Sequence, residues 1–444
     1  MPIEICTIGG YTQTGGNSVA IKVGEEVVIL DMGLNMENYI RYTEDREDIS
    51  AKSYKELLKA GAVPDYNFIN DWKDKVLAIV PSHAHLDHCG AIPFAAGLFP
   101  NVPIICTPYT IEVLKGALED DRIKIPNQLI PLNANSTYKL SENMILEFIH
   151  VTHSIPHTVI VVLHTPEGKV MYANDYKFDR QPTLGKAPNF ERLEELGKEG
   201  IKVLIIECLY AEEHRKMPSE SVAKQMLKEV MLGTNSQGKA MIVTTFSSHI
   251  ARLKSIIEMG KKLNRKIVFL GRSLAKYIKA AEDLGLVNFK QDVEIISYRD
   301  KIEKALRKIM KDGKDKYLIV CTGHQGEPKA ILSRMAREEH DFRFDEGDII
   351  IFSCSVIPVQ LNRDNRNRLE SNLHSKNVRI FKDVHVSGHA AREDHRELLE
   401  LIKPQAVIPA HAGGEKAREL ADLATKMGFK KVFLMEDGKR VVIK

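Results

Sequence analysis

The chain has 444 residues, of which 43% are hydrophobic and 28% charged, and its formal net charge at pH 7 is +3. This length predicts two or three domains with a large core, the composition is ordinary for a globular protein, and the net charge is too small to indicate a nucleic-acid partner by itself. No apolar run approaches the ~20 residues of a membrane helix, and the start lacks a basic region followed by an apolar one, so we expect a cytoplasmic protein without membrane contact.

The first 208 residues are rich in short apolar runs that predict β-strands. These runs occupy residues 3–8, 19–23, 27–30, 77–80, 103–106, 144–151, 159–164, 170–172 and 203–208. Helix-like segments at 51–60 and 91–97 interrupt them. This pattern favours two stacked sheets covered by helices.

From about residue 209 the pattern changes to a regular alternation of helix and strand. Helices are predicted at 221–231, 249–263, 274–284 and 302–310, and strands at 240–245, 267–270, 317–321 and 348–352. This rhythm is typical of βαβ units in a parallel sheet, which the last of these strands would close.

The last part of the chain, 373–444, returns to short strands. They are predicted at 378–381, 406–409, 432–435 and 440–443, with helices at 392–402 and 415–427. The economical interpretation is a first domain formed by residues 1–208 and 373–444, interrupted by an inserted domain at 209–372.

Four potential metal ligands lie within six residues, in the run His83-x-His85-x-Asp87-His88 that follows the apolar segment 76–80. Buried histidine and aspartate cost several kcal/mol unless they are satisfied, and a metal ion both neutralises and coordinates them. We expect the run to form a loop at the carboxyl end of a strand, where open α/β sheets place their sites. His83 and His85 would share one side, and Asp87 and His88, after a turn, would face a second ion. The alternative is a histidine-rich solvated loop.

A centre with two ions needs ligands from further along the chain. His153, Asp175 and His411 each follow a strand-like apolar run and would project into one crevice. Asp31, also at a strand end, is better placed to accept a hydrogen bond from a ligating imidazole. Each residue alone is more simply a core histidine or a turn aspartate, but their ordered recurrence favours a metal centre.

The motifs in chain order resemble a known family. The motif residues are Asp31, His83, His85, Asp87, His88, His153 and Asp175, which resemble the hydrolases of the metallo-β-lactamase fold. Glu207, His389 and His411 resemble the β-CASP branch, which acts on nucleic acids. Segments 322–328 and 385–390 resemble the ribonuclease J family, in its archaeal form. The resemblance implies an α/β fold, an αββα sandwich with an inserted α/β β-CASP domain.

The resemblance also implies a ligand set and catalytic roles. The implied ligands are His83, His85 and His153 for one ion, Asp87, His88 and His411 for the other, and Asp175 between them. Imidazole and carboxylate ligands without thiolate suit Zn²⁺, two per chain, with Mn²⁺ as the alternative. Asp87 or Asp175 would orient the attacking hydroxide, and His389, held by Glu207, would stabilise the scissile phosphate or protonate the leaving oxygen.

The implied substrate is single-stranded RNA carrying a 5′-monophosphate. Its implied contacts are His385, Val386, Ser387, Gly388 and His389 near the cut, and Ser353, Ser355, Arg272, Gly323 and His324 around the terminal phosphate. For Arg272 a surface salt bridge is the alternative.

We expect a ribonuclease of RNA degradation and processing, mainly a 5′–3′ exoribonuclease with some endonuclease activity, that forms a homodimer. The alternatives are a β-CASP endonuclease of RNA 3′-end processing and a catalytically weak, metal-stabilised RNA-binding scaffold.

Overall fold

The computed structural model describes residues 2–44, 53–357 and 359–444. These residues form two compact units. The first unit comprises Met1–Arg180, Ala187–Met217 and Gly388–Lys444, and the second comprises Gln181–Lys186 and Pro218–Ser387. The domain bounds at 208/209 and 372/373 stay a prediction.

Two mixed sheets make up the first unit. The first sheet has the order β19-β1-β2-β3-β4-β5-β6, with β1 (Ile3–Gly9), β2 (Ser18–Val23), β3 (Glu26–Leu30), β4 (Val76–Val80), β5 (Ile104–Cys106), β6 (Leu129–Pro131) and β19 (Arg440–Ile443). The second has the order β18-β11-β10-β9-β8-β7, with β7 (Ser136–Lys139), β8 (Ile145–His150), β9 (Val159–Thr165), β10 (Gly168–Ala173), β11 (Val203–Glu207) and β18 (Ala406–Ala410).

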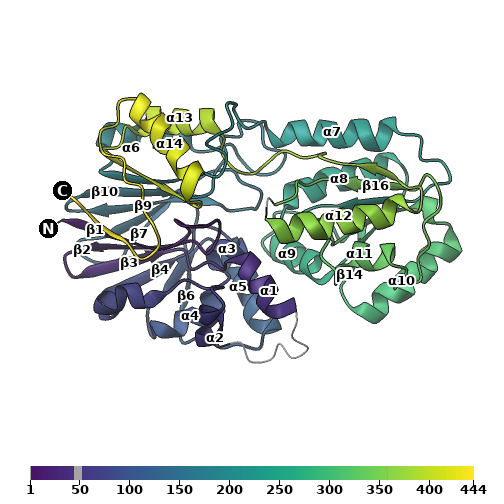
Figure 1. Cartoon of the computed structure of the whole chain (residues 1–444), viewed down its shortest axis with the longest axis horizontal. Coiled ribbons are helices and arrows are strands. Elements are labelled where there is room, and N and C mark those ends of the chain that lie inside the picture. The colour runs from purple at the N-terminus through teal and green to yellow at the C-terminus, as the bar shows by residue number, and fades with distance from the viewer. Residues whose placement is uncertain (1, 45–52, 358) are drawn as a thin grey trace. The chain divides into compact units, whose positions relative to one another are not determined.

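The two sheets pack face to face around one apolar core. Alternate residues of each strand fill it, such as Ile3 and Ile5 from β1 and Phe148 from β8. The opposite faces pack against helices (Figure 1). The first sheet is covered by α1 (Met36–Glu44), α2 (Tyr54–Lys59), α3 (Leu86–Cys89), α4 (Ile92–Ala95) and α5 (Pro108–Asp120), with 3-10 turns at Tyr66–Lys75 and Ala96–Leu98. The second is covered by α6 (Phe190–Glu199), α13 (Arg392–Ile402) and α14 (Gly414–Lys426). This confirms the αββα sandwich.

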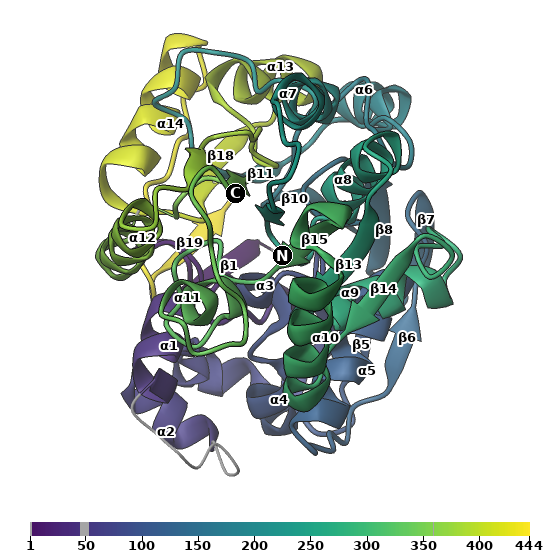
Figure 2. The ribbon, with the colours of Figure 1, turned by 90° about the vertical axis from the view of Figure 1, so that its right-hand side faces the viewer.

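The second unit is built on one parallel sheet. Its order is β14-β13-β15-β12-β16-β17, with β12 (Met241–Thr244), β13 (Lys266–Leu270), β14 (Val293–Ile296), β15 (Tyr317–Cys321), β16 (Ile349–Phe352) and β17 (Arg379–Phe381). Its helices are α7 (Glu220–Gly233), α8 (Ile250–Lys262), α9 (Arg272–Asp283), α10 (Arg299–Asp312), α11 (Ile331–Ala336) and α12 (Gln360–His374), with a 3-10 turn at Lys314–Lys316. Figure 2 shows α9 and α10 beside the β13–β14 end of this sheet. Every strand pair is parallel, as the alternation predicts.

Three local predictions were wrong. The sheet of the second unit ends at β17, not at the strand predicted for 348–352, because Ile350 pairs with Ile380. Residues 432–435 make only one bridge, Val407 to Val432, so their apolar pattern reflects packing against the core rather than a strand ladder. The end of the ligand run is helix α3 and not a loop.

The helix predicted at 51–60 is seen as α2, which begins after the capping residue Ser53, and residues 51 and 52 lie outside the described residues. Among the described residues, no helix has both the length and the apolar character that a bilayer span requires.

Candidate metal centre

The ligand run leaves β4 and enters helix α3. His83 and His85 lie on the connecting segment, and His85 is the N-cap residue of α3 with extended backbone angles. Asp87 and His88 lie on the first turn of that helix. The main-chain N–H of His88 donates to the carbonyl of His85 at 3.0 Å, which closes the turn and brings four donor side chains to one end of the sheet.

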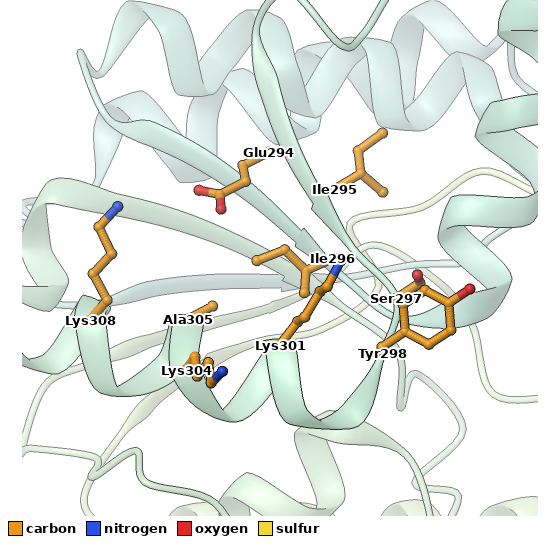
Figure 3. Close-up of a pocket in the computed structure, with 9 residues that line it drawn as sticks. All are labelled: Glu294, Ile295, Ile296, Ser297, Tyr298, Lys301, Lys304, Ala305 and Lys308. Carbon is orange, nitrogen blue, oxygen red and sulfur yellow. The ribbon is translucent and has the colours of Figure 1, made fainter.

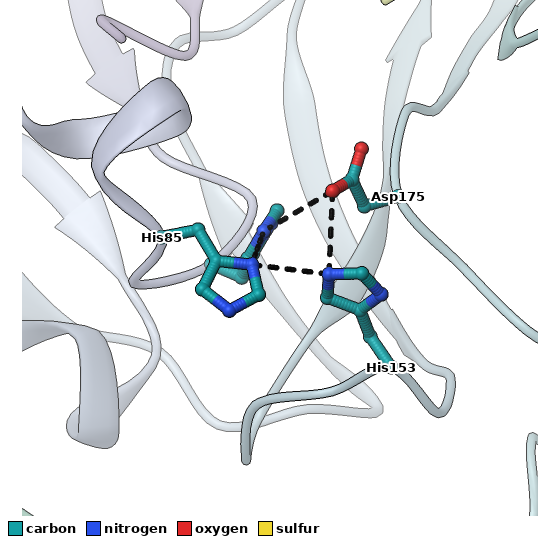
Figure 4. Close-up of side chains that lie close together, drawn as sticks. His85, His153 and Asp175 are labelled. Atoms are coloured by element: carbon teal, nitrogen blue, oxygen red, sulfur yellow. Dashed lines mark hydrogen bonds and ion pairs between the residues drawn. The ribbon is translucent and has the colours of Figure 1, made fainter. Parts of the chain in front are cut away.

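One cluster of donor atoms gathers around Asp175, which follows β10. The Oδ2 atom of Asp175 lies 3.5 Å from Nε2 of His83 and 3.3 Å from Nε2 of His153. The Nδ1 atom of His85 lies 3.1 Å from each of those two imidazole nitrogens. Figure 4 shows His85, His153 and Asp175 turned toward one another from three separate segments.

A second cluster shares the same carboxylate. Nε2 of His88 lies 3.5 Å from Oδ2 of Asp87 and 3.3 Å from Oδ2 of Asp175. His411, after β18, brings its Nε2 atom to 3.5 Å from Oδ1 of Asp175 and 3.9 Å from Oδ2 of Asp87. Asp175 therefore faces both clusters.

These donor sets fit a metal ion. A tetrahedral Zn²⁺ with bonds of about 2.0–2.1 Å holds its ligand atoms about 3.3 Å apart, close to the spacings around Asp175. The ligand atoms of His83, His85, His153 and Asp175 lie within 4.8 Å of one another, and so do those of Asp87, His88 and His411. In the described part of the chain, Oδ1 of Asp175 is buried without a hydrogen-bond partner, and a buried oxygen of this kind calls for one.

The outer nitrogens of the histidines are held by fixed acceptors. Nδ1 of His88 lies 2.7 Å from Oδ2 of Asp31, and Nδ1 of His153 lies 2.7 Å from the carbonyl oxygen of Gly388. Asp31 also accepts from the main-chain N–H of Ser82 and from the hydroxyl of Tyr172, each at 2.7 Å. Such contacts set which ring nitrogen faces a metal.

Asn17 is a contact that the sequence did not single out. Its side-chain amide lies within 3.0 Å of Nδ1 of His411, and its Nδ2 atom lies 3.1 Å from Nε2 of His88. Its main-chain N–H donates to the carbonyl of Asp87 at 3.0 Å. The signal in the sequence was the Gly15-Gly16-Asn17 turn, whose two glycines have φ of +83° and +67°.

Burial keeps most of these imidazoles neutral at pH 7. It lowers the pKa of His85 and of His411 to about 4, and it holds the pKa of His83 and His153 well below the ordinary value. A neutral imidazole keeps the lone pair that binds a metal. At His88 burial acts in the same direction, but the carboxylates of Asp175, Asp87 and Asp31 outweigh it and raise the pKa of His88 well above its usual value.

Beside the clusters lies a pair formed by Glu207, which is buried at the end of β11, and His389, which is partly exposed. Nδ1 of His389 lies 2.8 Å from Oε2 of Glu207, whose Oε1 accepts from the main-chain N–H groups of Ala390 and Tyr176. Burial raises the pKa of Glu207 to about 7. Burial would lower the pKa of His389, but the carboxylates of Glu207 and Asp175 raise it to about 9. His389 therefore carries a proton near neutral pH.

The expected substrate contacts 385–387 belong to the second unit, where an arginine that the sequence did not single out contacts the first two of them. Arg252 is fully buried on α8 and forms an ion pair with Glu220 at 2.5 Å. Its Nη1 donates to Oγ of Ser353 at 2.9 Å and contacts Nδ1 of His385 at 3.2 Å, and its Nη2 donates to the carbonyl of Val386 at 3.3 Å. In the sequence, Arg252 looks like any charged residue of an amphipathic helix, so nothing indicates that it is buried.

The residues expected around a terminal phosphate gather on neighbouring loops of the second unit. The side chain of Gln325 donates to the carbonyl of Ser355 at 3.0 Å, which joins the loop of Gly323 and His324 to the end of β16. Gly271, which precedes Arg272, lies against Thr322, so these three segments adjoin. Arg272 is exposed, and no carboxylate of the described residues lies within ion-pair distance of it.

The fold and the clustered donors define a metallohydrolase of the metallo-β-lactamase superfamily. Residues 11–272 match the sequence model of that superfamily, residues 237–369 match "Ribonuclease J, beta-CASP domain", and residues 376–435 match "Zn-dependent metallo-hydrolase RNA specificity domain".

Comparison with individual relatives identifies the family within this superfamily. The chain is 42% identical to a ribonuclease J of Methanocaldococcus jannaschii, over 99% of this chain and 98% of the relative. It is 43% identical to a ribonuclease J of Pyrococcus abyssi, over 99% and 97%. A crystal structure of a protein of unknown function from Enterococcus faecalis shares the fold, with a TM-score of 0.67, 18% identity and full coverage of both chains. The chain belongs to the ribonuclease J family.

Proposed function

We propose that this protein is a metal-dependent ribonuclease that hydrolyses RNA phosphodiesters, mainly as a 5′–3′ exonuclease with some endonuclease activity. The observation that carries the proposal is the pair of donor clusters that share Asp175. The relatives called ribonuclease J support the choice of RNA as substrate, since they match the chain from end to end.

The metal proposed is Zn²⁺, two ions per chain, with Mn²⁺ as the alternative. Imidazole and carboxylate donors suit either ion, and the described donor clusters include no thiolate. The proposed ligands are His83, His85, His153 and Asp175 for one ion, and Asp87, His88, His411 and Asp175 for the other. When bound, the ions lower the pKa of water toward ~7 and neutralise charge at phosphorus.

We assign the remaining catalytic roles to two side chains at the clusters. Asp87 is the one carboxylate of the clusters whose side chain keeps notable exposure, at 25%, so it is suited to orient water that enters from solvent. His389 is protonated near neutral pH and is fixed through Nδ1 by Glu207. We assign to it a hydrogen bond to the scissile phosphate and delivery of a proton to the leaving oxygen.

The proposed substrate is single-stranded RNA with a 5′-monophosphate. Glycine-rich turns expose main-chain N–H groups to a terminal phosphate, and Gly323, with φ of +123°, lies on such a turn. The residues proposed to hold the substrate are Ser353, Ser355, Arg272, Gly323 and His324 for the terminal phosphate, and His385, Val386, Ser387, Gly388 and His389 near the cut. A cytoplasmic location and a homodimeric state are part of the same proposal.

The test follows the products of 5′-labelled RNA on zinc-reconstituted protein. We expect labelled mononucleotide as the first product, faster cleavage of 5′-monophosphate than of 5′-triphosphate RNA, and slow cutting of circular RNA. The double variant His85→Ala, Asp87→Ala should lose cleavage and bound metal while keeping its circular dichroism spectrum. A matched pair of exposed residues in the first unit, His214→Ala with Asp422→Ala, should change neither.

Other product patterns would contradict parts of the proposal. Internal fragments as the first products would indicate an endonuclease of RNA 3′-end processing. RNA binding without turnover by fully metallated protein would indicate a binding scaffold instead.

A further inference from the structure

The second unit carries a lysine-rich groove at one edge of its sheet. β14 is the end strand in the sheet order, and α10 follows it directly in the chain. A cavity of about 420 Å³ lies between them, and a second of about 460 Å³ adjoins it, since Glu294 and Lys308 line both. Neither cavity is lined by a residue of the metal clusters.

Helix α10 presents two distinct faces. Ile302, Leu306 and Ile309 are buried and anchor the helix on the sheet. Lys301, Lys304 and Lys308 lie three and four residues apart, so they share another face, and they line the first cavity (Figure 3). From Lys301 to Lys308 the helix rises about 10 Å, a length along which a chain of phosphates can run.

None of these lysines forms an ion pair with a described residue, although Lys308 lies near enough to help lower the pKa of the exposed Asp312 carboxyl. A charged helix face is usually balanced by its own acidic residues, but Glu303 pairs with His340 at 2.6 Å and Arg307 with Asp341 at 2.9 Å. Across the part of the chain that the structure describes, no carboxylate lies within ion-pair distance of Lys301, Lys304 or Lys308. With Glu294 as the one acidic side chain of the first cavity, that cavity has an excess of positive charge.

An aromatic ring lies at the end of the lysine row. Tyr298 is the N-cap residue of α10, and its side chain is 66% exposed. Aromatic side chains in folded proteins are usually much more buried than this. The ammonium group of Lys301 lies 5.7 Å from the centre of its ring. An exposed ring beside a row of cations is the combination that binds single-stranded nucleic acid, because bases stack on the ring while phosphates follow the charges.

We propose that the groove of Tyr298, Lys301, Lys304 and Lys308 is an additional binding site for single-stranded RNA, separate from the residues that perform hydrolysis. It would hold the sugar-phosphate backbone without regard to sequence, because lysine reads phosphate charge and a tyrosine ring stacks on any base. The inference rests on the proposed function in one respect, that RNA is the substrate. An acidic peptide added to the β14 edge is the rival occupant, and the exposed aromatic ring favours RNA over it.

The experiment measures how salt weakens the binding of a cleavage-resistant phosphorothioate RNA of 30 nucleotides, by fluorescence anisotropy on the metal-loaded protein. For single strands, log Kobs falls with log salt by about 0.7 per phosphate neutralised, so Lys304→Gln with Lys308→Gln should reduce that slope by about 1.4. The control, Lys228→Gln with Lys262→Gln, removes two exposed lysines of the same unit that lie outside both cavities and on other helices, and it should leave the slope unchanged. Tyr298→Ala should weaken binding about 5- to 150-fold.

The outcomes separate this inference from the proposed function. Groove variants should still cleave a five-nucleotide RNA at the wild-type rate. If the wild-type protein cleaves RNA but the groove pair retains the wild-type salt slope, or loses binding of polyglutamate and not of RNA, the groove inference is wrong. If the slope falls as expected but wild-type protein cleaves nothing, the groove stands and the proposed function fails.

Discussion

Two sites are each built on a buried carboxylate: the metal centre on Asp175, and the group of contacts around Arg252 on Glu220. They differ in where the charge that compensates the carboxylate comes from. Glu220 is 5% exposed and has a guanidinium of its own, so both of its oxygens are hydrogen-bonded. Asp175 is 2% exposed and faces three imidazoles that burial keeps neutral, those of His83, His153 and His411, and one of its oxygens has no hydrogen-bond partner in the described residues. The first carboxylate is satisfied by the polypeptide, whereas the second requires a cation that the sequence does not encode.

The pKa of Glu220 reflects the counter-charge that the chain supplies. Burial acts to raise the pKa of Glu220, but the neighbouring His249 and Arg252 hold it well below its usual range. The charge of Glu220 is therefore a permanent part of the folded second unit. A centre completed by metal should respond to chelators, while a centre completed by arginine should not, and the following predictions test this contrast.

The largest effect is expected from Asp175→Ala. This change removes the carboxylate that both clusters share, so we expect both ions to be lost and RNA cleavage to fall at least about 1,000-fold. Elemental analysis and a cleavage assay on the same preparation check this. Exposed Asp422→Ala, in the same unit, serves as control. A variant that keeps two ions per chain would mean that Asp175 is not a shared ligand.

The second-largest effect is expected from Arg252→Met, which removes the guanidinium cation beside Glu220. The buried carboxylate of Glu220 then lacks its counter-charge, which should cost about 3–5 kcal/mol of unfolding free energy. Urea denaturation measures it, with and without chelator, and the cost should be the same in both. The double variant Arg252→Met, Glu220→Gln should recover much of the loss, since no charge is then left buried. Equal stability of the single and double variants would contradict this role of Arg252.

The contrast also shows why one of these sites could be predicted from the sequence and the other could not. His83, His85, Asp87 and His88 were recognisable because four donor side chains packed into one short run are rare outside a metal site. Arg252 is just as buried but lies in an ordinary amphipathic helix, where its pattern is that of a solvated charge. A residue whose role depends on contacts far along the chain leaves no local trace.

The fold was likewise predictable only where local sequence patterns determine it. Strands of the sandwich were predictable from apolar runs, and the parallel sheet from its alternation with helices. Strand β17 was predicted at 378–381, but its place at the end of the parallel sheet was not, because that place depends on pairing with β16 and leaves no mark in its own three residues. Helix α12 was missed for a related reason, since its sequence is strongly polar and only Leu369 and Leu373 supply large apolar anchors.

A smaller effect is expected from Asp31→Asn. The variant keeps the shape of the side chain but weakens the acceptor for Nδ1 of His88, 2.7 Å away. Loss of such an orienting contact typically costs about 10–100-fold in metal affinity, so we expect about that drop, with little change in unfolding free energy of the metal-free protein. Competition with a chelator of known affinity measures it. Unchanged affinity would show that Asp31 supports the loop through Ser82 rather than the ligand.

The smallest effect concerns Glu147, a carboxylate whose partners lie near the surface. Its oxygens lie 2.7 Å from Nε2 of His164 and 2.7 Å from Nε of Arg192. Burial would raise the pKa of Glu147, but these hydrogen bonds lower it to about 2 from an ordinary 4.5. A carboxylate whose pKa is lowered by folding stabilises the protein above the unfolded value, and this stabilisation is lost as pH falls from 4.5 toward 2.

Because water screens its partly exposed partners His164 and Arg192, the contribution of Glu147 should be about 1 kcal/mol rather than the full value of the shift. Glu147→Gln should therefore lower the unfolding free energy by about 1 kcal/mol at pH 6, and the difference from wild type should shrink below about pH 4.5. Urea midpoints between pH 6 and pH 3 measure it, with Glu142→Gln, an exposed partner of Lys139, as control. Parallel stability curves for the Glu147 variant and wild type would mean that His164 and Arg192 do not stabilise this carboxylate, and the contrast would then hold only for fully buried sites.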